Sequence, residues 1–267
     1  MSKKRVVVMS DLHSGHVVGL TPKSWHLEHK EEVDSNWSKW NKWVKIQEEL
    51  WKSYIAILKK LQPIDVLIVN GDCIDGKGKR SGGSELICSD RNEQVEMAVS
   101  CIKEAKARKI IMTYGTAYHA GIEEDWEAQV ATKVNARKIG SHEWIDVNGL
   151  IFDVKHHVGG SSIPHGRHTA IAREKLWNGI WAEHEEQPKS AVLIRSHVHY
   201  FSYAGGDDWL GITTPALQGM GSKYGARQMS GHINWGVLSF DVKSKKEWSW
   251  KSHLRRLVSQ VATPVKI

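Results

Sequence analysis

The stretch Val6-Val7-Val8-Met9-Ser10-Asp11-Leu12-His13 sets the expected architecture of this chain. Its four leading apolar residues are typical of a strand that is buried on both faces of a parallel sheet. Asp11 and His13 follow at the point where that strand would end. Open α/β sheets bind ligands in the crevice beyond the carboxyl ends of their strands. A carboxylate next to an imidazole suits zinc, manganese or iron, so the stretch predicts metal ligands at a sheet edge.

Downstream of this stretch, apolar runs alternate with helical patterns. Two further strands are predicted at residues 65–70 and 109–114, and helices at 36–61, 91–108 and 123–136. The helix at 36–61 carries apolar residues at mostly three- and four-residue steps, which gives it one face that can pack on a sheet. Alternating strands and helices favour a mostly parallel sheet with helices on its faces.

The second half of the chain follows a different pattern. Asn148-Gly149 between apolar runs at 143–147 and 151–155 predicts a two-residue hairpin. A helix is predicted at 166–186, with Ile171, Leu176, Trp177 and Ile180 facing inward. Further strands are predicted at 191–196, 235–241 and 247–250.

Polar side chains of the same kinds as Asp11 and His13 follow each of the later strands. These side chains are Asp72, His119, His156 with His157, and His197 with His199. A sheet gathers its strand ends in one place, and buried carboxylates and imidazoles need a cation to satisfy them. The number of donors predicts two metal ions, with Asp72 placed to bridge them. Such a pair stabilises in-line displacement at phosphorus.

Asp11-Leu12-His13, Gly71-Asp72, His156 and Ser196-His197-Val198-His199 together resemble the calcineurin-like metallophosphoesterase superfamily, with the motifs in the family's order. The resemblance implies an α/β fold with a two-layer β-sandwich flanked by helices, here with a helical insertion after the first strand. It implies a first divalent metal on Asp11, His13, Asp72 and His199, and a second on Asp72, His156 and His197. Manganese, zinc, iron and nickel are the candidate ions.

This sequence departs from the family at the third strand. The family pattern there is Gly-Asn-His followed by Asp or Glu, whereas this chain has Gly115-Thr116-Ala117-Tyr118-His119. Two interpretations of the missing Asn are open: Thr116 is a weak oxygen ligand of the second metal, or a water molecule takes the place of the Asn side chain. His119 is either the general acid that protonates the leaving group or a ligand of the second metal, and the acid is favoured.

Two further choices stay open in the sequence. His156 is favoured over His157 as the ligand by the family pattern, which leaves His157 to contact phosphate or to point away. Beyond them, His165 and Arg167 lie in a polar, basic stretch before a helix. Arg binds phosphate oxygens bidentately, so Arg167 is a candidate substrate clamp, and a surface position is equally compatible with the sequence.

Length, charge and cysteine content bound the remaining questions. The 267 residues predict a single domain, with the helical insertion at about 21–62, and the formal net charge is +7. That charge, with loop residues Lys77, Lys79 and Lys223, favours a polyanionic partner such as nucleic acid. Three cysteines without C-x-x-C spacing indicate a reducing compartment, and no signal-peptide or membrane-spanning run is evident. A cytoplasmic enzyme without a membrane partner is therefore expected, and its oligomeric state stays open.

The resulting hypothesis is a metal-dependent phosphoesterase that hydrolyses a phosphodiester, with nucleic acid as the first candidate substrate. A phosphomonoesterase that acts on phosphoprotein or nucleotide is the alternative within enzymes. A non-catalytic nucleic-acid-binding member of the same fold is kept open by the altered third motif, and a single structural zinc site is a further alternative.

Overall fold

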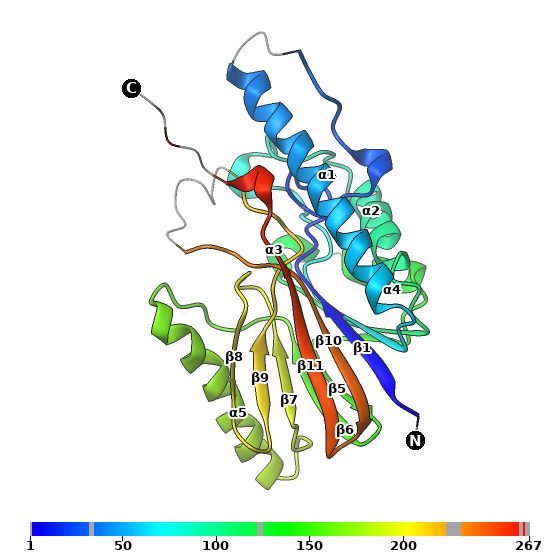
Figure 1. The fold of residues 1–267 in the computed structure, drawn as a ribbon, viewed down its shortest axis with the longest axis vertical. Helices are drawn as coiled ribbons and strands as arrows, with labels where there is room; N and C mark the ends of the chain where they lie inside the picture. Colours follow the sequence, from blue (N-terminus) through cyan, green and yellow to red (C-terminus); the bar gives the residue numbers. More distant parts are fainter. Residues whose placement is uncertain (1, 32–34, 122–124, 223–230, 262–263, 265–267) are drawn as a thin grey trace.

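A computed structural model describes residues 2–31, 35–121, 125–222, 231–261 and 264. Two β-sheets pack face to face, and helices cover the outer faces of both (Figure 1). This is the mixed α/β architecture with two sheets flanked by helices that the sequence predicted. The loop residue Lys223 lies outside the described residues.

The first sheet has six strands in the order β11-β10-β1-β2-β3-β4. Strands β1 to β4 pair in parallel, and β10 and β11 join beside β1 as an antiparallel hairpin. The bounds are β1 Lys4–Met9, β2 Val66–Asn70, β3 Lys109–Thr113, β4 Lys138–Gly140, β10 Trp235–Ser244 and β11 Glu247–Arg255.

The second sheet has five strands in the order β5-β6-β7-β9-β8, with antiparallel strands at both edges. The predicted hairpin at Asn148-Gly149 joins β5 to β6, and both of its residues have positive φ, as a tight two-residue turn requires. The bounds are β5 His142–Val147, β6 Leu150–Lys155, β7 Val192–Arg195, β8 Ser202–Gly205 and β9 Leu210–Thr213.

Side-chain alternation along β1 explains why this strand lies at the centre of the molecule. Val6 and Val8 point to the second sheet and pack in the core between the sheets, whereas Val7 and Met9 point to the helices. All four side chains are fully buried. The core between the sheets is closed by Phe152 and Phe240, whose rings meet edge to face with centroids 5.1 Å apart.

Helices α1 (Ser35–Leu61), α2 (Arg91–Lys103) and α4 (Trp126–Lys133) cover the first sheet (Figure 1). The apolar face predicted for the first of these helices is confirmed at Leu50, Tyr54 and Leu58, which are buried against the sheet. The short helix α3 (Ala117–Ala120) follows β3. Single turns of 3₁₀ helix occur at Lys23–Trp25, Lys79–Ser81, Pro164–Gly166 and Val258–Gln260.

Helix α5 (Arg167–Glu183) covers the second sheet, but with a different face from the one predicted. Ile171 is fully buried, as expected, whereas Leu176, Trp177 and Ile180 are 63%, 51% and 38% exposed. The prediction that these three residues face inward is therefore wrong. The side of α5 that meets the sheet carries the small Ala170, and the polar Asn178 is buried there because its amide bonds the Pro188 carbonyl and the Ser190 amide.

Within the described residues, no helix combines the length and the apolar character needed to cross a bilayer.

Candidate metal centre

Parallel pairing brings the first predicted ligands together, because the pairing of β1 with β2 continues beyond the strand ends. The amide of Asp11 donates to the Gly71 carbonyl at 3.0 Å, and the amide of His13 donates to the Asp72 carbonyl at 3.0 Å. The segments that carry Asp11 and Asp72 therefore run side by side at the carboxyl edge of the first sheet.

Most of the predicted ligands have a left-handed backbone conformation, which sets the direction of their side chains. Asp11, His13, Asp72, His197 and His199 have φ values of 52°, 46°, 51°, 70° and 55°. Positive φ is uncommon in residues other than glycine, and such strain persists only where the surrounding structure holds it in place. All five residues follow strands in the sequence, and their shared backbone conformation turns each loop sharply at the strand end.

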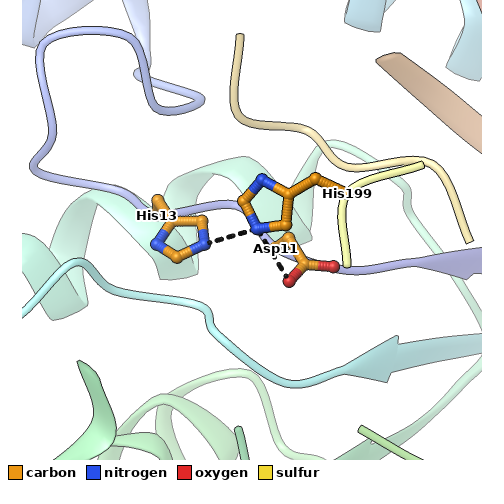
Figure 2. A group of neighbouring side chains, drawn as sticks. All are labelled: Asp11, His13 and His199. Atoms are coloured by element: carbon orange, nitrogen blue, oxygen red, sulfur yellow. Dashed lines mark hydrogen bonds and ion pairs between the residues drawn. The ribbon is translucent and has the colours of Figure 1, made fainter. Parts of the chain in front are cut away.

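Asp11, His13 and His199 form one group of facing ligand atoms (Figure 2). Nε2 of His199 lies 3.2 Å from Nε2 of His13 and 3.2 Å from Oδ1 of Asp11. Nδ1 of His13 is 3.2 Å from the Asp75 carboxylate, which can accept its proton and leave a lone pair on Nε2.

The carboxylate of Asp11 fits a cation. Asp11 is fully buried, and neither of its oxygens accepts a hydrogen bond of good geometry from any described residue. A buried carboxylate without donors carries a large desolvation penalty unless a positive charge offsets it. Its nearest neighbours are imidazole nitrogens, which are themselves metal ligands when neutral, so the residues present match the predicted divalent ion.

Asp72, His156 and His197 form a second group beside the first. Nε2 of His156 lies 3.0 Å from Oδ2 of Asp72 and 3.9 Å from Oδ1 of Asp11. Nδ1 of His156 donates to the Asn70 carbonyl at 2.7 Å, which directs Nε2 toward the carboxylates. Gly71 has φ of 75°, and a Cβ there would lie 2.5 Å from Nδ1 of His156, so only glycine permits this approach.

The two groups meet at Asp72, the residue predicted to bridge two ions. Oδ2 of Asp72 is 3.0 Å from Nε2 of His156 and 4.0 Å from Nε2 of His13. Two carboxylates and four imidazoles therefore converge at one edge of the sheet. That convergence is the geometry on which a dinuclear site depends, although the number and identity of the ions stay predictions.

Charge balance in the centre depends on one imidazole. Burial lowers the pKa of His156, but Asp72 and Asp11 raise it to about 10. Burial raises the pKa of Asp11, but His199 and His156 lower it to about 2. Burial raises the pKa of Asp72 as well, but His156 and His13 lower it well below its usual range. A protonated His156 and the two ionised carboxylates therefore stabilise one another. Divalent cations compete with such protons, because the ligands must be deprotonated to bind.

His119 lies on α3 at the rim of the centre, in contact with the first group. Its Nδ1 donates to the Asp75 backbone carbonyl at 2.8 Å, and its ring meets the His13 ring edge on with centroids 4.5 Å apart. The side chain of His119 is 19% exposed, close to the 17% of His199 and more than the 3% of His13. His119 can therefore reach both the centre and solvent.

Thr116 contacts the bridging carboxylate directly. Its backbone amide donates to Oδ1 of Asp72 at 2.7 Å, and its hydroxyl donates to the same oxygen at 3.1 Å. Because its hydroxyl proton points to Asp72, Thr116 orients that carboxylate. At the position where the family pattern has Asn, this chain therefore places a hydrogen-bond donor to the Asp72 carboxylate.

Sequence reasoning missed three residues that orient the centre. Asp75 contacts Nδ1 of His13, and the backbone carbonyl of Asn70 accepts a hydrogen bond from Nδ1 of His156. Glu127 accepts hydrogen bonds from the amide of Cys73, which follows Asp72, and from the amide of Gly115 in the loop after β3. The first two lie within three residues of Asp72, which is the signal that could have found them. No local signal marks Glu127, which comes from α4.

The remaining predicted residues lie around the centre. His157 is exposed and stacks on His197 with ring centroids 4.8 Å apart, so His156, not His157, faces Asp72. The guanidinium of Arg167 lies over the Tyr200 ring, 4.3 Å from its centroid, and Tyr200 directly follows His199. His165 is exposed, and no contact joins it to the centre among the described residues.

Comparison with solved structures found several phosphoesterase-like chains. An archaeal phosphodiesterase aligns with 15% identity and a TM-score of 0.44, over 93% of this chain and 99% of that chain. Vps29 from Cryptosporidium parvum aligns with 8% identity and a TM-score of 0.49, over 95% and 98%. The phosphoesterase YfcE from E. coli aligns with 11% identity and a TM-score of 0.43, over 92% and 96%.

No protein-family model and no curated protein matches this sequence. All three alignments have TM-scores below 0.5 and identities of 15% or less.

Proposed function

We propose that this protein is a metal-dependent hydrolase of phosphate esters that acts on phosphodiesters. The observation that carries the proposal is Asp11, a fully buried carboxylate that faces His13 and His199 and accepts no hydrogen bond of good geometry from the described residues. The second group, at Asp72 and His156, adjoins it. Donors of this number and kind, at the carboxyl edge of a sheet, favour a pair of divalent ions.

The first ion would be held by Asp11, His13 and His199, and the second by His156 and His197, with Asp72 shared between them. Bound divalent ions supply Lewis acidity and lower the pKa of coordinated water into the neutral range. The backbone amide and the hydroxyl of Thr116 hold Asp72 in place. Asp75 and Asn70 fix which nitrogen of His13 and of His156 faces inward.

His119 is proposed as the general acid. Its Nδ1 is committed to the Asp75 carbonyl, so a second proton would reside on Nε2, on the remaining side of the ring. An imidazolium in that position can protonate an alkoxide as it leaves phosphorus. His119 is partly exposed, so an acid at this position could be reprotonated from solvent.

Arg167 is proposed to bind a non-reacting phosphate oxygen. Its Nε is buried without a described partner, and its guanidinium plane is held against Tyr200, next to the ligand His199. An oriented guanidinium is suited to bidentate contact with phosphate.

The test is hydrolysis of a bis-aryl phosphate and of the matching mono-aryl phosphate by protein loaded separately with manganese, zinc, iron or nickel. We expect faster turnover of the diester and loss of both activities in Asp72→Asn, with an unchanged circular dichroism spectrum. Faster monoester turnover would identify a phosphomonoesterase. Metal binding without turnover of either ester would identify a non-catalytic member of the fold.

The role of His119 has a separate readout. His119→Gln should lower kcat by about 10²- to 10⁴-fold with little change in KM. The loss should be larger for an alkyl leaving group than for an aryl one, since an aryloxide needs less protonation. An equal loss for both leaving groups, together with reduced metal content, would make His119 a ligand instead.

A further inference from the structure

The outer side of α5 carries an exposed apolar surface. Half of the eight large apolar side chains that are exposed among the described residues lie on this one helix, at Leu176, Trp177, Ile180 and Trp181. Single exposed apolar residues are normal on a monomer, whereas a contiguous group of them marks an interaction surface. We call these four residues the α5 face.

Helical periodicity explains how α5 packs on its sheet and still presents this face. Successive residues are about 100° apart around a helix, so Leu176 and Ile180 lie on the side opposite to Ile171 and Asn178. Ile171 and Asn178 are buried against the second sheet. Strands β7, β8 and β9 of that sheet contact the helix. Figure 1 shows α5 on the outside of the sheet, with its far side turned away from the rest of the molecule.

The charges of α5 run against its dipole. The first turn begins with Arg167 and has no acidic residue, and the last turn holds Glu183 and has no basic residue. Glu185 and Glu186 follow directly. An isolated helix is stabilised by the opposite arrangement, with acids at its amino end and bases at its carboxyl end. The stability of the helix by itself therefore does not account for this pattern.

A second copy of α5 in antiparallel orientation matches both features. Two-fold symmetry makes an interface self-complementary, with the same surface contributed by each copy. Antiparallel alignment sets the basic end of each helix beside the acidic end of the other, and the two dipoles then attract rather than repel. The apolar residues between those ends would meet their own counterparts and leave water.

Arg173 and Glu183 fix the register of such a pair. Arg173 lies one turn before Leu176, Glu183 lies one turn after Ile180, and both charged side chains are exposed. If Leu176 of one copy is level with Ile180 of the second copy, Arg173 is level with Glu183 of the second copy, because the two pairs share one midpoint. Opposite charges would then rim an apolar centre at both ends, as in other protein interfaces.

A membrane surface matches the α5 face less well. Amphipathic helices that bind membranes carry Lys and Arg on their polar side, because biological membranes are anionic. The carboxylates of Glu183, Glu185 and Glu186 at the end of α5 would be repelled by such lipids. The charge pattern thus favours a second copy of this chain.

We propose that the protein forms a two-fold dimer in which α5 packs antiparallel on α5 of a second copy. The interface is centred on the α5 face, with Arg173 of each copy against the acidic end of the other helix. One helix from each copy buries less surface than a standard stable interface, so the dimer should dissociate on dilution. Each chain keeps its own metal centre, and the dimer does not rest on the proposed function.

The test is sedimentation velocity of the full chain over a concentration series from low micromolar to several hundred micromolar. The weight-average mass should rise from one chain toward two. The double variant Leu176→Gln with Ile180→Gln should raise the Kd of dimerisation by about tenfold or more, because both side chains lie at the centre of the interface.

Tyr203→Gln with Val258→Gln is the matched control. Both residues are exposed and apolar, like those of the α5 face. The Tyr203 ring meets that of Trp250 in the first sheet, so it lies on the side of the second sheet away from α5, and Val258 lies in a 3₁₀ turn near the end of the chain. This variant should dimerise as the wild type does.

Charge reversal tests the orientation of the two helices. Arg173→Glu and Glu183→Arg should each weaken dimerisation, because each sets like charges level with one another across the two-fold axis. The combined variant exchanges the charges and should recover most of the affinity. Weakening that persists in the combined variant would contradict the antiparallel arrangement.

A wild-type chain that stays monomeric throughout the series would overturn the proposal, as would equal weakening by the two apolar double variants. Phosphatidylcholine vesicles that bind the monomer, with loss of binding in Leu176→Gln with Ile180→Gln, would assign the α5 face to a lipid surface instead. Thermal unfolding in dilute solution should be the same for all variants, which excludes misfolding. Sedimentation needs neither metal nor substrate, so this proposal and the hydrolase proposal fail separately.

Discussion

Oδ1 of Asp75 lies 3.2 Å from Nδ1 of His13, and this contact leaves Nε2 of His13 facing Nε2 of His199 at 3.2 Å. A buried carboxylate thus selects the tautomer of an imidazole that belongs to the predicted metal centre. Carboxylate partners of this kind raise the basicity of a ligating histidine and hold its ring in position.

Asp75→Asn should lower the affinity for zinc or manganese by about 10- to 100-fold, because an amide is a weaker partner for the His13 N–H. Isothermal titration calorimetry measures the change. Asp207→Asn, at an exposed position, is the control and should bind metal as the wild type does. Unchanged affinity in Asp75→Asn would show that His13 does not depend on this contact.

Gly115→Ala should displace the bridging carboxylate. A Cβ at Gly115 would overlap Oδ1 of Asp72 and also its backbone nitrogen, which cannot move aside as the end of a side chain can. We expect lower metal content and lower stability, measured by elemental analysis and thermal unfolding. In contrast, Gly179→Ala on α5 meets nothing within 4 Å and should stabilise the helix by about 0.5–1 kcal/mol. Equal effects of both substitutions would contradict the packing at Gly115.

Glu127 predicts a pH dependence of stability. Burial, with Asp72 nearby, raises its pKa from 4.5 to about 7. Between these values the folded state binds the proton more tightly than the unfolded state, so this contribution to stability falls as pH rises from 4.5 through 7. The full change is about 3 kcal/mol.

Chemical denaturation of wild type and Glu127→Gln in chelator, at pH 5 and pH 8, tests this dependence. The stability of the wild type relative to the variant should decrease toward pH 8. Glu247→Gln, at an exposed position where the carboxylate pairs with Lys243, is the control and should show no such trend. A pH-independent difference for Glu127→Gln would mean that this carboxyl is ionised throughout the range.

The face of α5 that meets the second sheet can be tested by a pair of substitutions. Trp177→Gln should change the free energy of unfolding by less than about 0.5 kcal/mol, because Trp177 is half-exposed. Ile171→Ala should cost about 2–5 kcal/mol, because Ile171 is fully buried. A large decrease in the free energy of unfolding of Trp177→Gln would instead support the inward-facing orientation that the sequence predicted.

Several features of the fold follow from local sequence patterns. The four apolar residues of β1 predicted a strand buried on both faces, and Asn148-Gly149 predicted a hairpin, because side-chain alternation and turn geometry are local properties. The placement of Asp11, Asp72 and His199 after strands predicted that they converge, because parallel strands end at one edge. Helix α5 is the feature that local patterns did not predict, because the positions of its apolar residues do not determine which face of the helix packs on the sheet.

The amino-acid sequence alone specifies the types of donor and the strand ends that carry them. Which donors face one another depends on the three-dimensional fold: His156 and not His157 lies beside Asp72, Asp75 contacts His13, and Thr116 donates to the carboxylate. These contacts depend on left-handed backbone turns and on the approach of segments far apart in the chain. Those conformations are unfavourable locally and persist only because the packed sheets hold them.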